Sequence, residues 1–202
     1  MNSVPRQLIL ASASPRRREL LAEAGYQFRV VAPGEAAEDA GRDGESPAQL
    51  VARLARQKAA DVAGRIDSGL IVACDTVADC EGKILGKPRD EAHAREMLQW
   101  LSGRKHHVYS GLCLWPLPEG RPRIEVERTT LRMRRLTAAE IDDYLAGGLW
   151  RGKAGAFGYQ DRLGWLEIIE GSESNVVGLP LERLAAMLAD PSLATIGTGR
   201  PQ

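Results

Sequence analysis

The stretch from Leu8 to Leu21 places the strongest constraint on how this chain can fold. It reads Leu-Ile-Leu-Ala-Ser-Ala-Ser-Pro-Arg-Arg-Arg-Glu-Leu-Leu, which predicts a buried strand, a tight polar turn and an amphipathic helix. Ser14 is expected to cap the helix, and Pro15 stands at the first helical position, where proline is tolerated. The fold must therefore accommodate a strand that leads directly into a helix.

Three consecutive arginines, Arg16, Arg17 and Arg18, fall in the first turn of that helix. The positive end of the helix dipole repels each cation by roughly 0.3–1 kcal/mol. A bound anion removes this conflict, because free backbone N–H groups and arginine forks both bind one. The stretch therefore predicts a phosphate site, with three solvated arginines as the alternative. Arg17 shares the inward helix face with Leu20 and Leu21, Arg16 lies to one side, and Arg18 points outward.

Composition narrows the classes of protein to consider. A chain of 202 residues suits one domain, or two small lobes, with a sizeable core. A net charge of zero does not favour a general nucleic-acid or anionic-membrane partner. There is no signal-peptide pattern and no apolar run of about 18 residues, so no membrane association is expected. The cysteines Cys74, Cys80 and Cys113 form no Cys-x-x-Cys pair, which disfavours a disulfide framework or zinc site and fits a reducing cytoplasm.

A lysine on the apolar face of a predicted helix is a second candidate for anion binding. The capping box from Ser46 to Gln49 starts a helix that runs to about Ala63. Lys58 lies in the middle of the apolar stripe of this helix. A lysine there either snorkels outward or is held by a buried or ligand anion. We favour the second interpretation, because other basic residues already occupy the wet side.

An acidic residue follows the most apolar strand of the chain. The run from Gly69 to Cys74 predicts a central strand covered on both faces, ending in Asp75-Thr76. Ligands in open α/β sheets sit beyond the carboxyl ends of strands, so Asp75 is the leading catalytic candidate. The alternative is a turn or cap residue. Residues 77–80 and 83–85 then predict a hairpin.

Two glycine-containing segments are able to approach a ligand closely. Gly86-Lys87-Pro88 would present Lys87 from a stiff turn, although this tripeptide alone is a weak signal. Residues 152–161 are glycine-rich and carry Lys153, but they lack the Gly-Lys-Ser/Thr ending of a P-loop. They remain able to place backbone N–H groups and the Gln160 amide against a ligand.

The remaining segments complete an alternation of helices and strands. His106 and His107 are adjacent, so on a strand they point to opposite faces and are interpreted as structural or surface residues. Further helices are expected over about 90–103, 137–145 and 180–189, further strands over 28–31, 108–115, 124–133 and 163–170, and a loose tail after Asp190.

Seven motifs occur in order along the chain. They are Ser12-x-Ser-x-Arg-Arg17, Lys58, Asp75-Thr76, Gly86-Lys87-Pro88, Leu101-Ser-Gly103, Lys153-Ala-Gly-Ala-Phe-Gly-Tyr-Gln160 and Asn175-Val-Val-Gly-Leu-Pro180. Together they resemble the Maf family of nucleoside triphosphate pyrophosphatases, from Leu8 to about Leu188. The resemblance implies an α/β fold related to the inosine triphosphatase type. It also implies a long mixed sheet flanked by helices, with the site in a cleft between two lobes of one domain (residues 1–190), and a tail over 191–202.

The resemblance implies hydrolysis of a nucleoside triphosphate to the monophosphate and pyrophosphate, with Mg²⁺, Mn²⁺ or Co²⁺ as cofactor. Asp75 matches the proposed general base of the family and a metal ligand, with Glu38 and then Glu35 of the acidic loop over 33–45 as further metal ligands. Simple solvation is the alternative for that loop. The matched substrate-binding positions are Arg16, Thr76 and Gln160 for base selectivity, and Ser12, Arg17, Lys58, Lys87 and Lys153 near the phosphates.

The late motif, with its Lys-Ala-Gly-Ala sequence, is similar to the branch that acts on dTTP and UTP, and modified nucleotides are further candidate substrates. Three residues beside Gln160 depart from the family pattern. Phe157 replaces a tyrosine, Tyr159 an aliphatic residue and Asp161 a glycine. Base preference is therefore left open at this point, as is a homodimer.

The expected chemistry uses these residues together. Arg17, Lys58 and Lys87 offset the phosphate charges, and Asp75 takes a proton from the water that attacks the α-phosphorus, or acts mainly as a metal ligand. Removal of non-standard nucleotides is one implied role. The rival from another class is a nucleotide-sensing regulator of septum formation that acts through a protein partner. A nucleic-acid module is disfavoured, because the net charge is zero and there is no aromatic–basic stripe.

Overall fold

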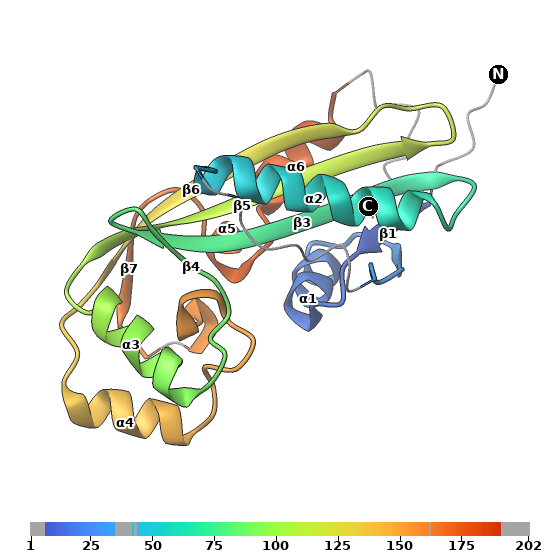
Figure 1. The fold of residues 1–202 in the computed structure, drawn as a ribbon. Helices are drawn as coiled ribbons and strands as arrows, with labels where there is room; N and C mark the ends of the chain where they lie inside the picture. The colour runs from blue at the N-terminus through green and yellow to red at the C-terminus, as the bar shows by residue number, and fades with distance from the viewer. Residues whose placement is uncertain (1–6, 35–41, 43, 162, 191–202) are drawn as a thin grey trace.

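The computed structural model describes residues 7–34, 42, 44–161 and 163–190 (Figure 1). The strands are β1 (Leu8–Ala11), β2 (Phe28–Val30), β3 (Gly69–Cys80), β4 (Lys83–Leu85), β5 (Lys105–Leu117), β6 (Arg123–Met133) and β7 (Leu166–Glu170). The helices are α1 (Pro15–Glu23), α2 (Pro47–Ala63), α3 (Glu91–Leu101), α4 (Ala138–Ala146), α5 (Glu173–Val177) and α6 (Leu181–Leu188), with 3₁₀ turns η2 (Ala154–Ala156) and η3 (Tyr159–Asp161). The predicted tail over 191–202 lies outside the described residues.

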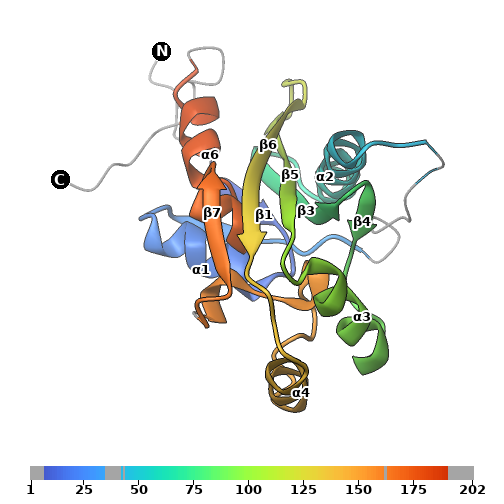
Figure 2. The ribbon, with the colours of Figure 1, turned by 90° about the vertical axis from the view of Figure 1, so that its left-hand side faces the viewer.

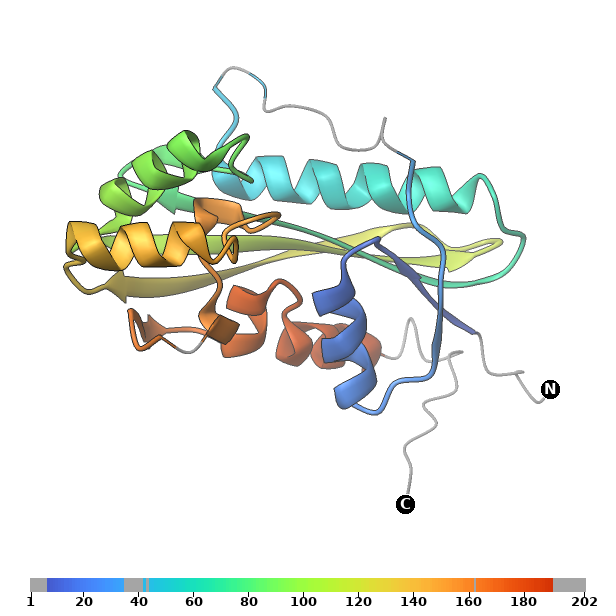
Figure 3. The same cartoon turned by 90° about the horizontal axis from the view of Figure 1, so that it is seen from below.

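One mixed sheet forms the centre of the fold, with strand order β2-β1-β3-β5-β6-β7 and β4 paired to β3. β1 runs parallel to β2 and β3, whereas β5, β6 and β7 add in antiparallel fashion. α2 covers one face of the sheet, and α1 and α6 cover the other (Figures 2 and 3). The predicted α/β class with a long mixed sheet and flanking helices is confirmed. No helix in the described part of the chain is long and apolar enough to span a membrane.

The opening strand-turn-helix unit forms as predicted, with one difference in its turn. All four residues of β1 are buried, and α1 begins at Pro15. Ser14 occupies the N-cap position, but its side chain makes no capping hydrogen bond, so that expectation is wrong. Instead the backbone N–H of Ser14 donates to the Ser12 hydroxyl at 3.2 Å. A serine that bonds the amide two residues later closes such a turn locally.

The central strand is longer than predicted. β3 does not end at Asp75 but continues to Cys80, because antiparallel β5 pairs with it from Gly69 to Asp79. Asp75 therefore lies in the middle of a strand. The other edge of β3 pairs with β1 over residues 70–73 and with β4 over residues 78–80. Within the described chain no strand pairs with residues 74–77 on that edge, so a gap opens beside Asp75.

The remaining elements follow the predictions with shifted ends. The capping box of α2 is present, and the hairpin from β3 to β4 turns at Glu81 and Gly82, both with positive φ. β5 starts earlier than predicted and so includes both histidines, and β7 starts later. The short helix α5 was not predicted, because its five residues are too few to show helical periodicity.

Candidate active site

A cavity of about 890 Å³ opens at the gap in the β3 edge. The start of α1, the middle of α2, β3, β5 and the η2–η3 segment all contribute to its wall. The lining includes all nine of the predicted substrate-binding and catalytic residues: Ser12, Arg16, Arg17, Lys58, Asp75, Thr76, Lys87, Lys153 and Gln160. The structure thus brings together side chains that are separated by up to about three-quarters of the chain. Their individual roles stay predictions.

Asp75 and Lys58 form a buried ion pair in this cavity. The Lys58 ammonium donates to Oδ1 of Asp75 at 2.6 Å, and the two side chains are 6% and 12% exposed. α2 places Lys58 toward the sheet, because this residue shares the apolar stripe that packs on β3 and β5. The lysine therefore does not snorkel outward. Each charge offsets the desolvation cost of the other. Replacing one of the two residues by a neutral one would therefore leave an uncompensated buried charge.

The side chains of the three arginines of α1 point in different directions, as the helix geometry predicts. Arg17 points inward and donates to the Gly178 carbonyl at 2.8 Å, to the Thr76 hydroxyl at 3.1 Å and to the Ser12 hydroxyl at 3.4 Å. Arg16 lies to one side and donates to the Gly152 carbonyl at 3.0 Å. Burial, followed by the charge of Arg17, lowers the pKa of Arg16. Arg18 is exposed.

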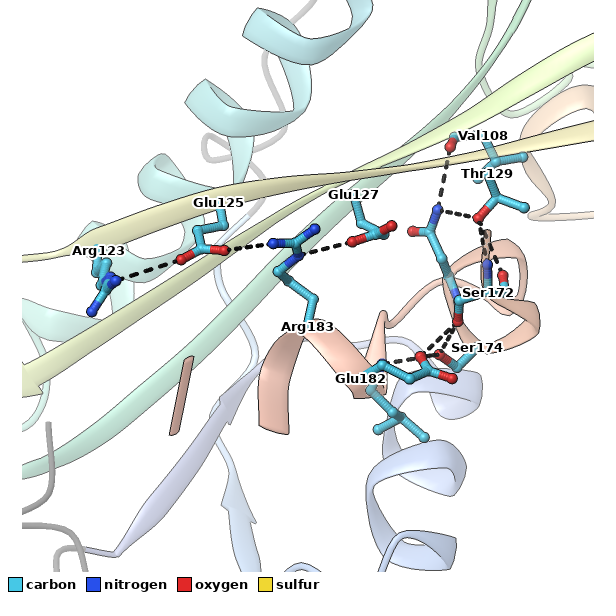
Figure 4. A network of polar contacts seen from close by, with 11 residues as sticks. Val108, Arg123, Glu125, Glu127, Thr129, Ser172, Ser174, Glu182 and Arg183 are labelled. Atoms are coloured by element: carbon cyan, nitrogen blue, oxygen red, sulfur yellow. Dashed lines mark hydrogen bonds and ion pairs between the residues drawn. The ribbon is translucent and has the colours of Figure 1, made fainter. Parts of the chain in front are cut away.

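A polar network that includes Val108, Thr129, Ser172, Ser174 and Glu182 holds α5 in place (Figure 4). The C-cap of α5 is Gly178, and its carbonyl accepts from Arg17. The Asn175 amide of α5 donates to the Val108 carbonyl at 3.3 Å and the Thr129 hydroxyl at 3.0 Å. Glu182 of α6 accepts from the hydroxyls of Ser172 and Ser174, each at 2.6 Å. These bonds tie the start and the middle of α5 to the sheet and to α6. The segment that orients Arg17 is therefore fixed from two sides.

The glycine-rich segment is organised around Asp161, a departure from the family pattern. The Lys153 ammonium lies 2.5 and 2.6 Å from the two carboxylate oxygens, and the side chains are 10% and 8% exposed. The Tyr144 hydroxyl donates to the same carboxylate at 2.7 Å, and the Gly158 amide donates at 3.3 Å. Burial, reinforced by Asp161, raises the pKa of Tyr144. The charge of Lys153 is thus balanced within the protein.

The far end of the cavity is apolar. Its lining residues are Ala78, Leu101, Val108, Leu131, Met133, Phe157, Leu166 and Val176. Phe157 is stacked on Trp165, with ring centroids 5.1 Å apart and planes 16° from parallel. A flat, apolar ligand group is the chemistry that this end can accept.

His106 also lines this apolar end, which the sequence interpretation missed. Both histidines lie on β5 and face opposite sides, as predicted. His107 contacts the Thr130 hydroxyl at 3.2 Å, whereas the imidazole of His106 is buried in the cavity wall. Alternation along the strand was the available signal, since it puts His106 on the same face as Val108 and Ser110.

A divalent cation finds one fitting ligand among the described residues. Asp75 supplies a carboxylate at the cavity, and Mg²⁺ takes one or two carboxylates together with phosphate oxygens. No cluster of three His, Cys, Asp or Glu side chains that could hold a metal occurs in the described part of the chain. Glu35 and Glu38 lie outside the described residues.

Comparison with known proteins gives the family of this chain. The family described as Maf-like protein matches residues 7–191. A dTTP/UTP pyrophosphatase of Rhodopirellula baltica is 53% identical over 91% of this chain and 82% of its own length, and one of Sphingopyxis alaskensis is 45% identical over 90% and 95%. A HAM1 protein structure from Coxiella burnetii aligns at a TM-score of 0.49 and 15% identity over 91% of this chain and 98% of its own. By the family match and by these sequence identities, the chain belongs to the Maf family.

Proposed function

We propose that this protein is a nucleoside triphosphate pyrophosphatase that hydrolyses dTTP and UTP to the monophosphate and pyrophosphate. One observation carries the proposal: a single cavity of about 890 Å³ combines a buried Asp75–Lys58 pair, inward-facing Arg17 and an apolar part of its lining. The two curated relatives described above are named for this activity. Modified nucleotides are further candidate substrates.

In this proposal the two ends of the cavity bind different parts of the substrate. Arg17 and Lys58 bring positive charge to the end where α1 begins, and Lys87 adds a further cation to the cavity lining. A triphosphate requires such charge. Free N–H groups at the start of α1 add donors for phosphate oxygens. The base then extends toward the apolar end beside Phe157. This orientation places the α-phosphate near Asp75, between the two ends.

In the proposed reaction Asp75 accepts a proton from a water molecule as the water oxygen attacks the α-phosphorus. The bond between the α-phosphorus and the oxygen that bridges it to the β-phosphate breaks, and pyrophosphate leaves with that oxygen. Lys58 holds the carboxylate in place through its contact at 2.6 Å. A divalent cation, held by Asp75 with Glu38 or Glu35, would offset charge on the phosphates. A role of Asp75 mainly in metal binding is the alternative.

Asp75→Asn tests the proposal directly. Asparagine is nearly the same size but is a poor proton acceptor, so we expect pyrophosphate release from dTTP and UTP to fall by about two orders of magnitude or more. The control is Asp67→Asn, because Asp67 is an exposed aspartate outside the cavity lining. Circular dichroism should show that both variants are folded. Normal turnover by folded Asp75→Asn would contradict the assignment.

A nucleotide-sensing regulator is not favoured, since the relatives above carry the names of enzymes. A screen of pyrophosphate release over standard and modified triphosphates with Mg²⁺, Mn²⁺ and Co²⁺ tests this choice. Binding without turnover in every combination would support the regulator.

We also propose a cytoplasmic location, which fits three free, buried cysteines. A single two-lobed domain over 1–190, a homodimer, and the lack of nucleic-acid and membrane partners stay predictions.

A further inference from the structure

The wall of the cavity changes character along one face of β5. At the charged end, Ser110 lies opposite Thr76 of β3, and their hydroxyls are 2.8 Å apart. Two residues further on the same face, Val108 lies opposite Ala78. His106, two residues before Val108 in the sequence, is next on this face, with Leu131 of β6 opposite it. The imidazole is therefore a polar group in a wall that is otherwise apolar.

The state of this imidazole is unusual for a buried polar group. His106 is 4% exposed, and its Nδ1 has no hydrogen-bond partner in the structure. Burying a polar atom in this way costs roughly 1–3 kcal/mol. Burial also lowers the pKa of His106 to about 4, although interaction with the backbone of Arg104 opposes the shift. At neutral pH the ring is uncharged, so one nitrogen is a donor and the other an acceptor.

A nucleobase has the complementary chemistry. Its two faces are flat and apolar, which suits a slot beside Phe157, and its edge carries donors and acceptors without a net charge. A neutral donor–acceptor partner suits such an edge better than an ammonium or carboxylate, because no charge is left uncompensated when the site closes. Gln160, which the family resemblance links to base selectivity, is exposed, whereas His106 belongs to the buried wall.

We propose that His106 determines base specificity by hydrogen bonding the polar edge of a pyrimidine bound at the apolar end of the cavity. The inference rests on the proposed function, since it assigns a residue to the base of that substrate. The edge in question is the one that carries the 4-oxo group and the N3 proton in uracil and thymine. The charged residues at the other end bind the triphosphate independently of His106.

The test compares UTP with 4-deoxyuridine triphosphate, which lacks both the 4-oxo group and the N3 proton but keeps the flat ring. For the wild-type protein we expect kcat/KM to be about tenfold or more lower for the analogue, because the site is left with an unpaired polar group. In His106→Leu the two substrates should differ by about threefold or less. The matched control is His107→Leu on the opposite face, which should keep the wild-type preference. Inhibition by inorganic tripolyphosphate should be unchanged in all three proteins.

The outcomes separate the two proposals. If the wild-type protein hydrolyses neither nucleotide, the proposed function fails and this inference fails with it. If the wild-type protein hydrolyses UTP but His106→Leu keeps the full preference over the analogue, the role of His106 alone is overturned. Should His106→Leu not fold, nitrogen-15 shifts of the His106 ring in the wild-type protein titrated with UMP replace the kinetic readout. A shift change supports the contact, and an unchanged ring at saturating UMP overturns it.

Discussion

At the scale of single residues, neighbouring identical side chains acquire different environments. Arg17 donates three hydrogen bonds to groups around the cavity, whereas Arg18, one position later on α1, is exposed. The difference follows from a rotation of about 100° per residue along an α-helix. The local conflict between three cations and a helix N-terminus is therefore concentrated on Arg16 and Arg17, which both line the cavity.

Paired substitutions on α1 test this separation. Arg17→Ala removes a cation from the triphosphate end and frees the Gly178 carbonyl, so we expect the KM for dTTP to rise about tenfold or more. Arg18→Ala should leave KM and kcat within about twofold of the wild-type values. Steady-state pyrophosphate release measures both. A severe loss in Arg18→Ala would show that the helix face has been assigned wrongly.

At the scale of secondary-structure elements, α2 determines where Lys58 can reach. This helix packs on β3 and β5 through an apolar stripe, and its backbone lies directly against β5 at Gly111. A Cβ atom at this position would lie 2.1 Å from the Val51 carbonyl oxygen and 2.7 Å from the Ala52 nitrogen. Both neighbours are backbone atoms, so a side chain can be accommodated only if the helix moves. Gly111 therefore sets the distance between α2 and the sheet.

Gly111→Ala tests this dependence. The free energy of unfolding in urea should fall by roughly 1–3 kcal/mol or more, because overpacking displaces backbone. Turnover should also fall, since the shift of α2 alters the contact between Lys58 and Asp75. Gly64→Ala is the control on the same helix, as its added Cβ lies at ordinary contact distance, 3.7 Å from the nearest atom. Equal effects of the two substitutions would argue against close packing at Gly111 as the cause.

At the scale of the whole molecule, the cavity exists because two kinds of pairing meet on β3. The parallel strand β1 stops at Ala11, opposite Ala73, and the hairpin partner β4 ends at Leu85, opposite Ala78. The segment between them carries Asp75 and Thr76, with α2 on one face of the sheet and α1 with α5 on the other (Figure 3). The catalytic candidate is thus placed by an interruption of the sheet edge rather than by the end of its own strand.

The stability of the whole molecule should depend on pH through His106. Its pKa is lowered from 6.5 to about 4, chiefly by burial and slightly by His107. Between these values the unfolded chain binds a proton that the folded protein does not, so the contribution is complete above pH 6.5 and is lost as the pH falls. The loss amounts to about 2 kcal/mol at pH 5.

Urea unfolding of the wild-type protein and His106→Leu at pH 7.5 and pH 5 measures the contribution of His106 to the free energy of unfolding. The wild-type protein should lose about 2 kcal/mol more of its free energy of unfolding than the variant over that interval. A constant difference between the two proteins at both pH values would show that the buried ring does not carry the shift.

The sequence by itself determined the elements and most of the candidate residues. Caps and periodicity located α1, α2, α3, α4 and α6, because these signals lie within a few neighbouring residues. The ordered motifs indicated the family and identified nine residues that line one cavity. The placement of Arg17, Arg16 and Arg18 on three sides of one helix also followed from sequence, since helical geometry alone decides it.

Tertiary structure decided what those residues contact. The polar pair Asp75-Thr76 looked like the end of a strand, and only pairing with β5 shows that the strand continues. Lys58 could have met any anion, but the packing of α2 gives it Asp75, 17 residues away. Lys153 looked available for phosphate until the fold placed it against Asp161. The residues next to His106 in the sequence did not indicate that it lines the cavity. The groups that bury it come from strands and loops that are distant in sequence.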